Sequence, residues 1–586
     1  MPGRVIDWRL LKRLIPYVAK YSWLVLITML SMLAVDAAGV LQPYLVKQAI
    51  DTNIVGGDVQ GLTRSVAAIG LLVMLGFVLQ FIFNYAIQYL GQRLIYALRL
   101  EVFQKVLSLS KDYFDKTPVG RTLTHVTNDV ESIREFISEG IVSAVGSVLK
   151  VTFIVAAMLL VNLRLTVISF TTIPLFVLVT LLFRRGIRSG YRDVRKANAS
   201  LNVSMIETIN GIREIHHFNH EDTSRSRFDT HNRRYLGAYL QVVDAYARFF
   251  PLIEVISNLG LALVLVYAHF GIGIRVQVGE VFAFFAYINM FFQPLRQLAE
   301  KYNMFQAAMA AAERVFGLLD EQASLSNPVR RPVGLPPARG AVAFDNVSFE
   351  YTNGNRVLKR LSFDIPAGQR IAVVGPTGSG KTTLVSLLAR LYDITEGRIL
   401  IDGVDIRELP LRDLRHVVAL VPQNIFLFTG TVAENIALND ASVDRARIER
   451  AAQHVSANRF IRKLPRGYDE NVLEEGKRLS VGQRQLLGLA RAFLRDPSVL
   501  ILDEATANID SETEHLIEDG IRVLLEGRTG IAIAHRLSTI RLVDRILVLH
   551  NGELVEEGSH RALIRQDGLY RQLYEMQKGS HLPEAM

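Results

Sequence analysis

GPTGSGKTT, residues 375–383, is the stretch that decides the fold of the second half of this 586-residue chain. It matches the pattern G-x-x-x-x-G-K-[ST], and it lies between a strand-like run, RIAVVG, and a helical run, TTLVSLLARLY. Glycines here let backbone N–H groups turn inward around phosphate groups, and the N-terminus of the next helix adds positive charge. The stretch therefore predicts a nucleotide triphosphate site in an α/β domain. A glycine-rich turn without a ligand is the weaker alternative in this context.

Side chains of this loop have separate expected roles. Lys381 is expected to bring positive charge to the phosphates, and Thr382 to give magnesium a hydroxyl ligand. The residues expected to contact the nucleotide are Gly375, Thr377, Gly378, Ser379, Gly380, Lys381, Thr382 and Thr383.

A second stretch, SVLILDEATANID at residues 498–510, has the pattern of a buried strand that ends in two carboxylates. At the end of a parallel strand, Asp503 can hold magnesium while Glu504 polarises an attacking water, which is the division of labour that phosphoryl transfer requires. Two adjacent acids after a strand are also common at ordinary helix starts. The position of this stretch after the phosphate loop favours the catalytic interpretation.

The composition divides the chain into two parts. Half of the residues are hydrophobic, and long apolar runs are concentrated in roughly the first 300 positions. The formal net charge of +9 indicates Lys and Arg in cytoplasmic loops rather than nucleic-acid binding, because the chain has long apolar runs. The absence of cysteine excludes disulfides, thiolate metal sites and cysteine nucleophiles. The N-terminus, MPGRVIDWRLLKRLIPYVAKYSW, is basic and amphipathic and resembles an interfacial helix rather than a signal peptide.

The first part contains six segments that are long and apolar enough to cross a bilayer of roughly 30 Å, which takes about 20 residues each. The long connections after the second and fourth segments are rich in Lys and Arg, which marks them as cytoplasmic and places both termini in the cytoplasm. Helices buried in a large soluble core are the alternative, but the rest of the sequence offers no partners for them. The segments lie near 22–46, 66–91, 138–161, 164–184, 249–271 and 279–300.

A proline-rich stretch separates the two parts. Its prolines, at positions 328, 332, 336 and 337, forbid a continuous helix. The predicted domains are therefore a transmembrane domain over 1–320 that begins with an elbow helix, a linker over 321–340 and a nucleotide-binding domain over 341–586.

The order of five stretches resembles the ATP-binding cassette (ABC) transporters. The stretches are GPTGSGKT, PQNIFLF, LSVGQRQ, LILDEATANID and AIAHRLS, and the six apolar segments ahead of them resemble the exporter branch of that family. The likeness covers nearly the whole chain, including YFDKTPVGRTLTHVTNDVESIREF at 113–136, which resembles the cytoplasmic extension and coupling region after the second span. It implies an α-helical six-span transmembrane domain in a domain-swapped dimer, fused to an α/β P-loop nucleotide-binding domain that uses ATP and Mg²⁺.

The resemblance also implies roles for residues outside the phosphate loop. Tyr351 would stack on adenine, Gln423 would contact magnesium and the attacking water, and His535 would touch the terminal phosphate. By themselves these residues have ordinary structural interpretations, and their joint order around the phosphate loop favours function. Glu474 would be the acid of a coupling loop in which Leu473 stands where glycine is usual, and Asp510 would belong to the loop that crosses the dimer interface.

The signature LSVGQ departs from the family's common L-S-G-G-Q. In the family, a serine and a glycine that correspond to Ser480 and Gly482, followed by Gln483, face the ATP bound to the partner subunit. Val481 adds a branched Cβ where the backbone must approach phosphate, and we expect it to need a backbone φ that only glycine tolerates. This predicts a heterodimer, in which the other chain carries an intact signature, as in asymmetric bacterial multidrug exporters. A homodimer that tolerates valine is the alternative.

Two cytoplasmic corners, 112–120 and 211–220, are predicted to couple the nucleotide domains to the membrane domain. The second corner includes His216, His217 and His220, followed by Glu221 and Asp222. These side chains could suggest a metal site, but their spacing places only one i, i+4 pair on a helical face, so the coupling interpretation is preferred.

The substrate is the least determined part of the prediction. Polar residues at membrane depth are expected to face the bundle interior or the dimer seam, and the aromatic run VFAFFAYINMFFQ at 281–293 is expected to form an apolar wall around a cavity. The alternative for each residue is packing between spans. The polar residues are Asp36, Gln42, Gln80, Gln88, Glu254 and Arg296.

Together these features predict ATP-driven export of amphiphilic small molecules, either drug-like compounds or lipids, across a bacterial cytoplasmic membrane by alternating access. A homodimeric lipid or peptide exporter and an ATP-gated regulatory module on the same scaffold are the alternatives. A soluble cassette ATPase is disfavoured by the fused spans, and an importer by the single chain. The expected partners are a second half-transporter, membrane lipids and the substrate, with no nucleic acid.

Overall fold

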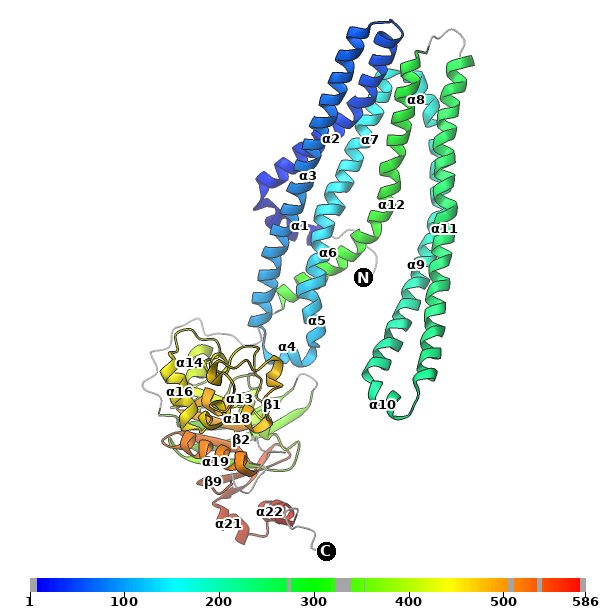
Figure 1. The fold of residues 1–586 in the computed structure, drawn as a ribbon. Helices are drawn as coiled ribbons and strands as arrows, with labels where there is room; N and C mark the ends of the chain where they lie inside the picture. The colour runs from blue at the N-terminus through cyan, green and yellow to red at the C-terminus, as the bar shows by residue number, and fades with distance from the viewer. Residues whose placement is uncertain are drawn as a thin grey trace. The chain divides into compact units, whose positions relative to one another are not determined.

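The structure is a computed structural model that describes residues 8–270, 276–321, 339–351, 354–503, 511–534 and 540–579, of which residues 295–303, 511 and 577–579 are described by their backbone alone. The chain forms two compact units, drawn in Figure 1. The first comprises Met1–Val106 and Gly120–Glu321, and the second comprises Leu107–Val119 and Gln322–Met586. Most of the predicted linker, 321–340, lies outside the described residues.

The described part of the first unit is helical. Its long helices follow from continuous apolar runs, and π-helical turns interrupt two of them. The helices are α1 (Trp8–Ala19), α2 (Ser22–Gln48), α3 (Val59–Ser108), α5 (Val119–Thr124), α6 (Val130–Glu135), α7 (Val142–Val161), α8 (Leu163–Phe170), α9 (Ile173–Asn210), α10 (Ile212–His217), α11 (Glu221–Phe270) and α12 (Val278–Asp320), with π-helical turns η1 (Ala49–Ile54), η2 (His125–Asp129) and η3 (Phe136–Ile141).

Five helical segments among the described residues are long and apolar enough to cross a membrane. They contain the first four predicted spans in full and the fifth, 249–271, as far as Phe270, since residue 271 lies outside the described residues. The sixth prediction, 279–300, falls in α12, where the side chains of 295–303 are outside the described set. The five segments are Ser22–Ile54, Val59–Ser108, Val119–Val161, Leu163–Asn210 and Glu221–Phe270.

The core of the first unit lies where α12 meets α2, α7, α8, α9 and α11. Phe284, Tyr287 and Phe292 of α12 are buried there, and the Tyr287 hydroxyl donates a hydrogen bond of 2.9 Å to the Val40 carbonyl oxygen of α2. Figure 1 shows α9 and α11 as a long pair joined by the short helix α10. Within this chain these three side chains pack span against span, and Phe292 also lines a small pocket with Phe291, so the apolar wall expected from the aromatic run stays a prediction.

The second unit is an α/β fold, with α4 (Lys111–Lys116) packed on it. Its strands are β1 (Val342–Glu350), β2 (Arg356–Ile365), β3 (Arg370–Val374), β4 (Glu396–Ile401), β5 (Val404–Asp405), β6 (Val418–Val421), β7 (Val499–Asp503), β8 (Thr529–Ile533), β9 (Arg545–His550) and β10 (Glu553–Gly558). Its other helices are α13 (Lys381–Leu388), α14 (Leu411–Val417), α15 (Val432–Ala437), α16 (Arg445–His454), α17 (Asn458–Ile461), α18 (Val481–Arg495), α19 (Ser511–Leu525), α21 (His560–Arg565) and α22 (Leu569–Gly579), with 3₁₀ turns η4 (Gly467–Asp469) and η5 (Glu474–Gly476).

The strands of this unit form two sheets. An antiparallel sheet has the order β2-β1-β4-β5, and a larger sheet has the order β10-β9-β3-β8-β7-β6. In the larger sheet β9, β3, β8, β7 and β6 are parallel, and only β10 runs antiparallel. Parallel strands place their carboxyl ends along one edge of a sheet, where α/β proteins bind ligands. The predicted nucleotide residues should therefore gather at that edge.

Candidate functional site

The phosphate loop follows β3 and ends at the start of α13, as predicted. Its glycines take positive φ angles of 154° at Gly375, 83° at Gly378 and 101° at Gly380. A Cβ at Gly375 would lie 2.2 Å from the Leu549 carbonyl oxygen, so this position accepts no other residue. These angles give the loop the tight, inward-turned backbone that phosphate binding requires.

Side chains of the loop fit an anionic ligand. Lys381 is buried, and its Nζ donates to the carbonyl oxygens of Gly375, at 2.7 Å, and Pro376, at 2.9 Å, so the ammonium spans the loop. The Ser379 hydroxyl is also buried, and it has no hydrogen-bond partner among the described residues. A buried hydroxyl without a partner costs free energy, and a phosphate oxygen would satisfy it. The tip of the loop, Thr377 and Gly378, is exposed.

The carboxyl ends of three neighbouring strands are in register at this site. Val373 of β3 pairs with Ile533 of β8, and Ile533 pairs with Asp503 of β7. Asp503 therefore lies two strands away from the strand that leads into the phosphate loop. Burial raises the pKa of Asp503 above its ordinary value, and the Lys381 ammonium offsets only part of that rise. A carboxylate whose desolvation is only partly compensated is suited to a cation.

Gln423 lies beside this row. It follows β6, whose last residue, Val421, pairs with Leu502 of β7, and its side chain is exposed. The oxygens of Thr382, Asp503 and Gln423 are hard donors of the kind that Mg²⁺ prefers, and Thr382 is exposed in the first turn of α13. These residues fit magnesium, which when bound neutralises phosphate charge. The other predicted catalytic residues, Glu504 and His535, and the predicted interface residue Asp510 lie outside the described residues.

Tyr351 belongs to an aromatic cluster at the start of α13. Its ring packs edge to face against Tyr392, with centroids 5.5 Å apart, and its hydroxyl is 3.1 Å from the hydroxyl of Thr383. A hydrogen bond thus joins the ring predicted to stack on adenine to the first turn of α13, the helix at the end of the phosphate loop. Its contact with adenine remains a prediction.

The same cluster reaches the first predicted coupling corner. The Tyr392 hydroxyl donates a hydrogen bond to the Asp115 carboxylate of α4, and the Lys111 ammonium lies 5.9 Å from the centre of the Tyr392 ring. Burial and the hydrogen bond to Asp115 both raise the pKa of Tyr392. For Asp115, burial raises the pKa, but hydrogen bonds from Lys111 and Tyr392 outweigh burial and lower it. Sequence reasoning missed this contact.

The signature residues form the N-terminus of α18. Ser480 and Gln483 make a reciprocal capping box, in which the Gln483 N–H donates to the Ser480 hydroxyl at 3.2 Å and the Ser480 N–H to the Gln483 side-chain oxygen at 3.0 Å. Val481 is the first residue of the helix and has no positive φ. The expectation that Val481 needs a glycine-only backbone is therefore wrong, because a helix start accepts a β-branched residue. Only its exposed side chain distinguishes it from glycine.

The comparisons with known proteins cover both units. The chain matches the ABC transporter transmembrane region over residues 25–295 and the ABC transporter domain over residues 358–507. The probable multidrug resistance ABC transporter ATP-binding/permease protein YheH of Bacillus subtilis is 36% identical over 89% of this chain and 78% of its own length. The ATP-dependent lipid A-core flippase of Burkholderia orbicola is 35% identical over 97% of this chain and 95% of its own length. The chain belongs to the ABC transporter family.

A solved structure places the chain among the exporters of this family. A bacterial Atm1-family ABC exporter with ATP bound has a TM-score of 0.77, 28% sequence identity, and coverage of 99% of this chain and 100% of its own. The chain is therefore a membrane protein that couples ATP hydrolysis to transport. The scaffold implies a dimer that interacts with lipid and a transported substrate.

The transporter has a strained backbone at Leu473, where the family usually has glycine. Leu473 has φ 58° and ψ −175°, a combination that glycine adopts far more easily than leucine. The predicted coupling-loop acid Glu474 follows and forms an ion pair of 3.1 Å with Lys477. Leu473, the residue that departs from the family pattern, therefore carries the backbone strain.

The histidine-rich corner of the transporter is α10 with the start of α11. His216 Nδ1 lies 2.8 Å from the Glu221 carboxylate, so this exposed histidine already has a partner within the chain. No group of three or more potential ligands that could hold a metal occurs among the described residues.

The membrane unit of the transporter contains a cavity of about 350 Å³ between α2, α3, α7 and α12, here termed the α2/α7 cavity. Asp36 and Gln80 line it, as the sequence led us to expect. Sequence reasoning missed Lys150 and Gln293, the first because a single lysine in an apolar span resembles a flanking charge. Among the other predicted polar residues, the side chains of Gln42, Gln88 and Glu254 are exposed on the surface of this chain, and that of Arg296 is outside the described set. The full lining is Met32, Val35, Asp36, Gln80, Phe83, Ser143, Gly146, Ser147, Lys150, Gln293 and Pro294.

Proposed function

We propose that this transporter exports amphiphilic small molecules, drug-like compounds or lipids, across a bacterial cytoplasmic membrane by alternating access driven by ATP and Mg²⁺. The observation that carries the proposal is a phosphate loop, beside oxygen side chains that fit magnesium, in the same chain as helices that are long and apolar enough to span a membrane and that enclose a partly charged cavity. The names of two relatives, a probable multidrug resistance transporter and an ATP-dependent lipid A-core flippase, support both substrate classes.

The transport cycle follows from differential binding. ATP held between two nucleotide domains would favour their closed arrangement, and hydrolysis would remove that preference. In this scheme Lys381 and the loop backbone hold the phosphates, Asp503 and Thr382 hold the cation, Gln423 contacts the cation and attacking water, and Glu504 polarises the water. Both termini would be cytoplasmic, because the Lys- and Arg-rich connections mark that side.

Coupling would use α10 in a domain-swapped dimer. Ile212 and Phe218 at the two ends of α10 are exposed. The nucleotide domain presents a groove of about 370 Å³ beside Gln423, with Phe426 and Phe428 exposed in its lining. An apolar corner and an apolar groove are complementary, and we propose that α10 of one subunit enters this groove of its partner.

The partner is proposed to be a different chain with glycine in its signature. What supports a heterodimer is the exposed, branched side chain of Val481 beside Ser480, together with the presence of Lys381, Gln423 and Asp503 for catalysis. Because Val481 has a helical backbone, its φ angle does not support the heterodimer. A homodimer in which valine is tolerated is the competing arrangement.

The proposed function is tested by amphiphile-stimulated ATP hydrolysis of the purified transporter, alone and with its partner, in lipid nanodiscs. At least one drug-like or lipid amphiphile should raise turnover several-fold over the basal rate. Lys381→Ala should abolish turnover and weaken ATP binding, because a charge on the phosphates is lost. Turnover that no amphiphile alters, or ATP affinity unchanged in Lys381→Ala, would contradict the proposal.

A further inference from the structure

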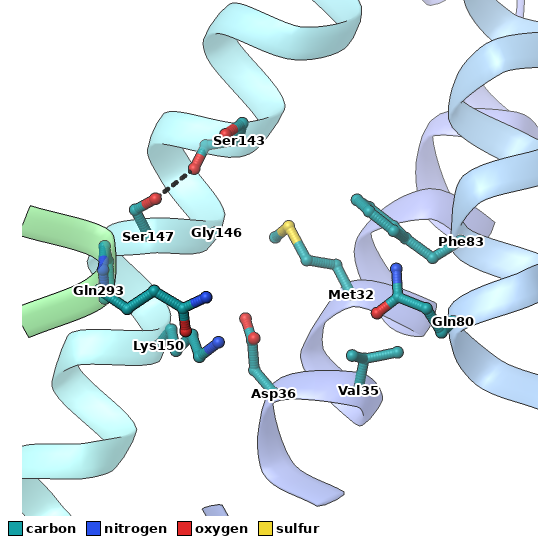
Figure 2. Close-up of a pocket in the computed structure, with 11 residues that line it drawn as sticks. Met32, Val35, Asp36, Gln80, Phe83, Ser143, Gly146, Ser147, Lys150 and Gln293 are labelled. Carbon is teal, nitrogen blue, oxygen red and sulfur yellow. Dashed lines mark hydrogen bonds between the residues drawn. The ribbon is translucent and has the colours of Figure 1, made fainter. Parts of the chain in front are cut away.

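The α2/α7 cavity carries one acidic and one basic side chain at membrane depth. Figure 2 shows Asp36 of α2 and Lys150 of α7 with their charged ends in the space between these helices. Charged groups in a membrane interior are costly, so their presence in apolar spans indicates a function. Both helices are long apolar elements, and each residue lies well inside its helix.

Neither charged group makes a direct contact with an opposite charge among the described residues, although the Lys150 ammonium acts on the Asp36 carboxylate electrostatically. Asp36 and Lys150 form no hydrogen bond, and no ion pair joins them there, although each is partly buried. Two opposite charges whose only role was to neutralise each other would gain most from direct contact. Both side chains line the same cavity without direct contact, so their charged groups remain available to a ligand.

The rest of the lining indicates the chemistry of that ligand. Gln80 and Gln293 add side-chain amides that both donate and accept hydrogen bonds. The Ser147 hydroxyl already donates to the Ser143 carbonyl oxygen at 2.8 Å, so it remains available only as an acceptor. Met32 and Phe83 supply apolar surface on the side of the cavity where Gln80 lies, as Figure 2 shows. The cavity thus combines two opposite charges with an apolar wall.

We propose that the α2/α7 cavity binds the headgroup of a zwitterionic amphiphile, with an ammonium group at Asp36 and a phosphate group at Lys150. The inference rests on the proposed function and specifies its substrate class. A purely cationic amphiphile would leave Lys150 without a partner, and a purely anionic one would leave Asp36 without a partner; each unpaired charge weakens binding in a desolvated site. A phosphate and an amine in one headgroup satisfy both ends.

The test is equilibrium binding to the full-length protein in uncharged maltoside micelles without ATP. Lysophosphatidylethanolamine is compared with alkyl ammonium and alkyl phosphate amphiphiles of the same chain length. The wild type should bind the zwitterion about tenfold or more tightly than either singly charged probe, since hydrogen bonds to charged groups have that effect. Glycerophosphoethanolamine, which has the headgroup but no acyl chain, distinguishes a lipid site from a site for the free headgroup.

Variants separate a binding role from a structural one. Asp36→Asn should shift the preference toward the alkyl phosphate, and Lys150→Gln toward the alkyl ammonium, so the two changes act in opposite directions. Thr152→Val is the matched control, because Thr152 lies on the same helix as Lys150, is exposed, and bonds to its own helix at Val148. It should leave all affinities unchanged.

Equal affinity of the wild type for all three probes would overturn the inference, as would single variants that lower every affinity alike. The wild-type comparison decides the matter if a variant fails to fold. Binding without ATP also keeps this result apart from the proposed function. A transporter that exports only singly charged amphiphiles would refute the zwitterion site alone, whereas selective binding without ATP-driven transport would refute the export proposal alone.

Discussion

Leu473 shows how one residue can carry backbone strain at a position where the sequence departs from the family pattern. A non-glycine residue near φ 58° and ψ −175° costs on the order of 1–3 kcal/mol. We predict that Leu473→Gly stabilises the nucleotide domain by about 1 kcal/mol, because relief of strain exceeds the entropy that glycine adds to the unfolded chain.

A thermal unfolding scan of the full-length protein measures this effect as a rise in the transition temperature of the nucleotide domain. Leu473→Ala is the control, because alanine removes the half-exposed side chain but keeps the Cβ that causes the strain. Equal shifts for the glycine and alanine variants would show that the side chain, not the backbone, sets the stability at this position.

Asp503 gives the nucleotide site a specific pH dependence. Its pKa is raised, so protons compete with Mg²⁺ at pH values where an exposed aspartate is already ionised. Affinity for MgATP should therefore be highest at pH values well above the raised pKa of Asp503, and it should fall as the pH decreases through that pKa. Titration of ATP binding with and without Mg²⁺ measures the difference.

Asp503→Asn is the control, since it should abolish the magnesium-dependent part of the pH profile. A wild-type profile that matches that of the asparagine variant would remove Asp503 from the magnesium site.

The residues of the phosphate loop were predictable from their spacing alone. The glycines take positive φ angles that the tight turn needs, and the lysine side chain contacts the loop that it follows. Val481 was predicted wrongly for the opposite reason. Its role depends on whether α18 begins before or after it, and the capping box of Ser480 and Gln483 decides that the helix begins at Val481. Asp36 and Lys150 line the same cavity because of the faces that α2 and α7 pack toward each other. The apolar pattern of a membrane span does not determine those faces.

Among the elements, α4 follows α3 in the chain and contacts the aromatic cluster of the nucleotide site within the second unit. Asp115 and Tyr392 are 277 positions apart, so no local pattern indicates their hydrogen bond, although the coupling corner itself was predicted. The chain of contacts runs from Tyr351 through Tyr392 to Asp115. This arrangement connects the predicted adenine contact to a coupling helix within one compact unit.

We predict that Tyr392→Phe lowers amphiphile stimulation of ATP hydrolysis several-fold while leaving ATP affinity near the wild-type value. Phenylalanine keeps the ring against Tyr351 but cannot donate to Asp115, so the change removes coupling rather than binding. Stimulated and basal hydrolysis, together with ATP binding, measure the two effects separately. Arg571→Ala, which breaks an exposed ion pair with Glu575 within α22, is the control and should change neither. Full stimulation in Tyr392→Phe would exclude the hydroxyl from coupling.

At the scale of the whole molecule, the identity of the partner depends on Val481. If its side chain impairs a site on the partner, the chain expressed alone should hydrolyse ATP slowly, and Val481→Gly should raise turnover several-fold. Co-expression with its genomic neighbour should give full activity without that substitution. Val481→Ala measures how much of the effect comes from the branched side chain. A stable homodimer of the wild-type chain with full stimulated hydrolysis and transport would establish the homodimer instead.

The central claim, that ATP hydrolysis in this chain drives export of an amphiphile, is tested most directly by accumulation of a labelled amphiphile in inside-out membrane vesicles. Vesicles that contain the transporter and its partner should accumulate the amphiphile with MgATP, and they should continue to do so when ionophores collapse the ion gradients. Glu504→Gln should retain ATP binding and lower hydrolysis at least about a hundredfold, with loss of accumulation, because the attacking water loses its base. Accumulation that ionophores abolish, or that persists at the wild-type rate in Glu504→Gln, would contradict the claim.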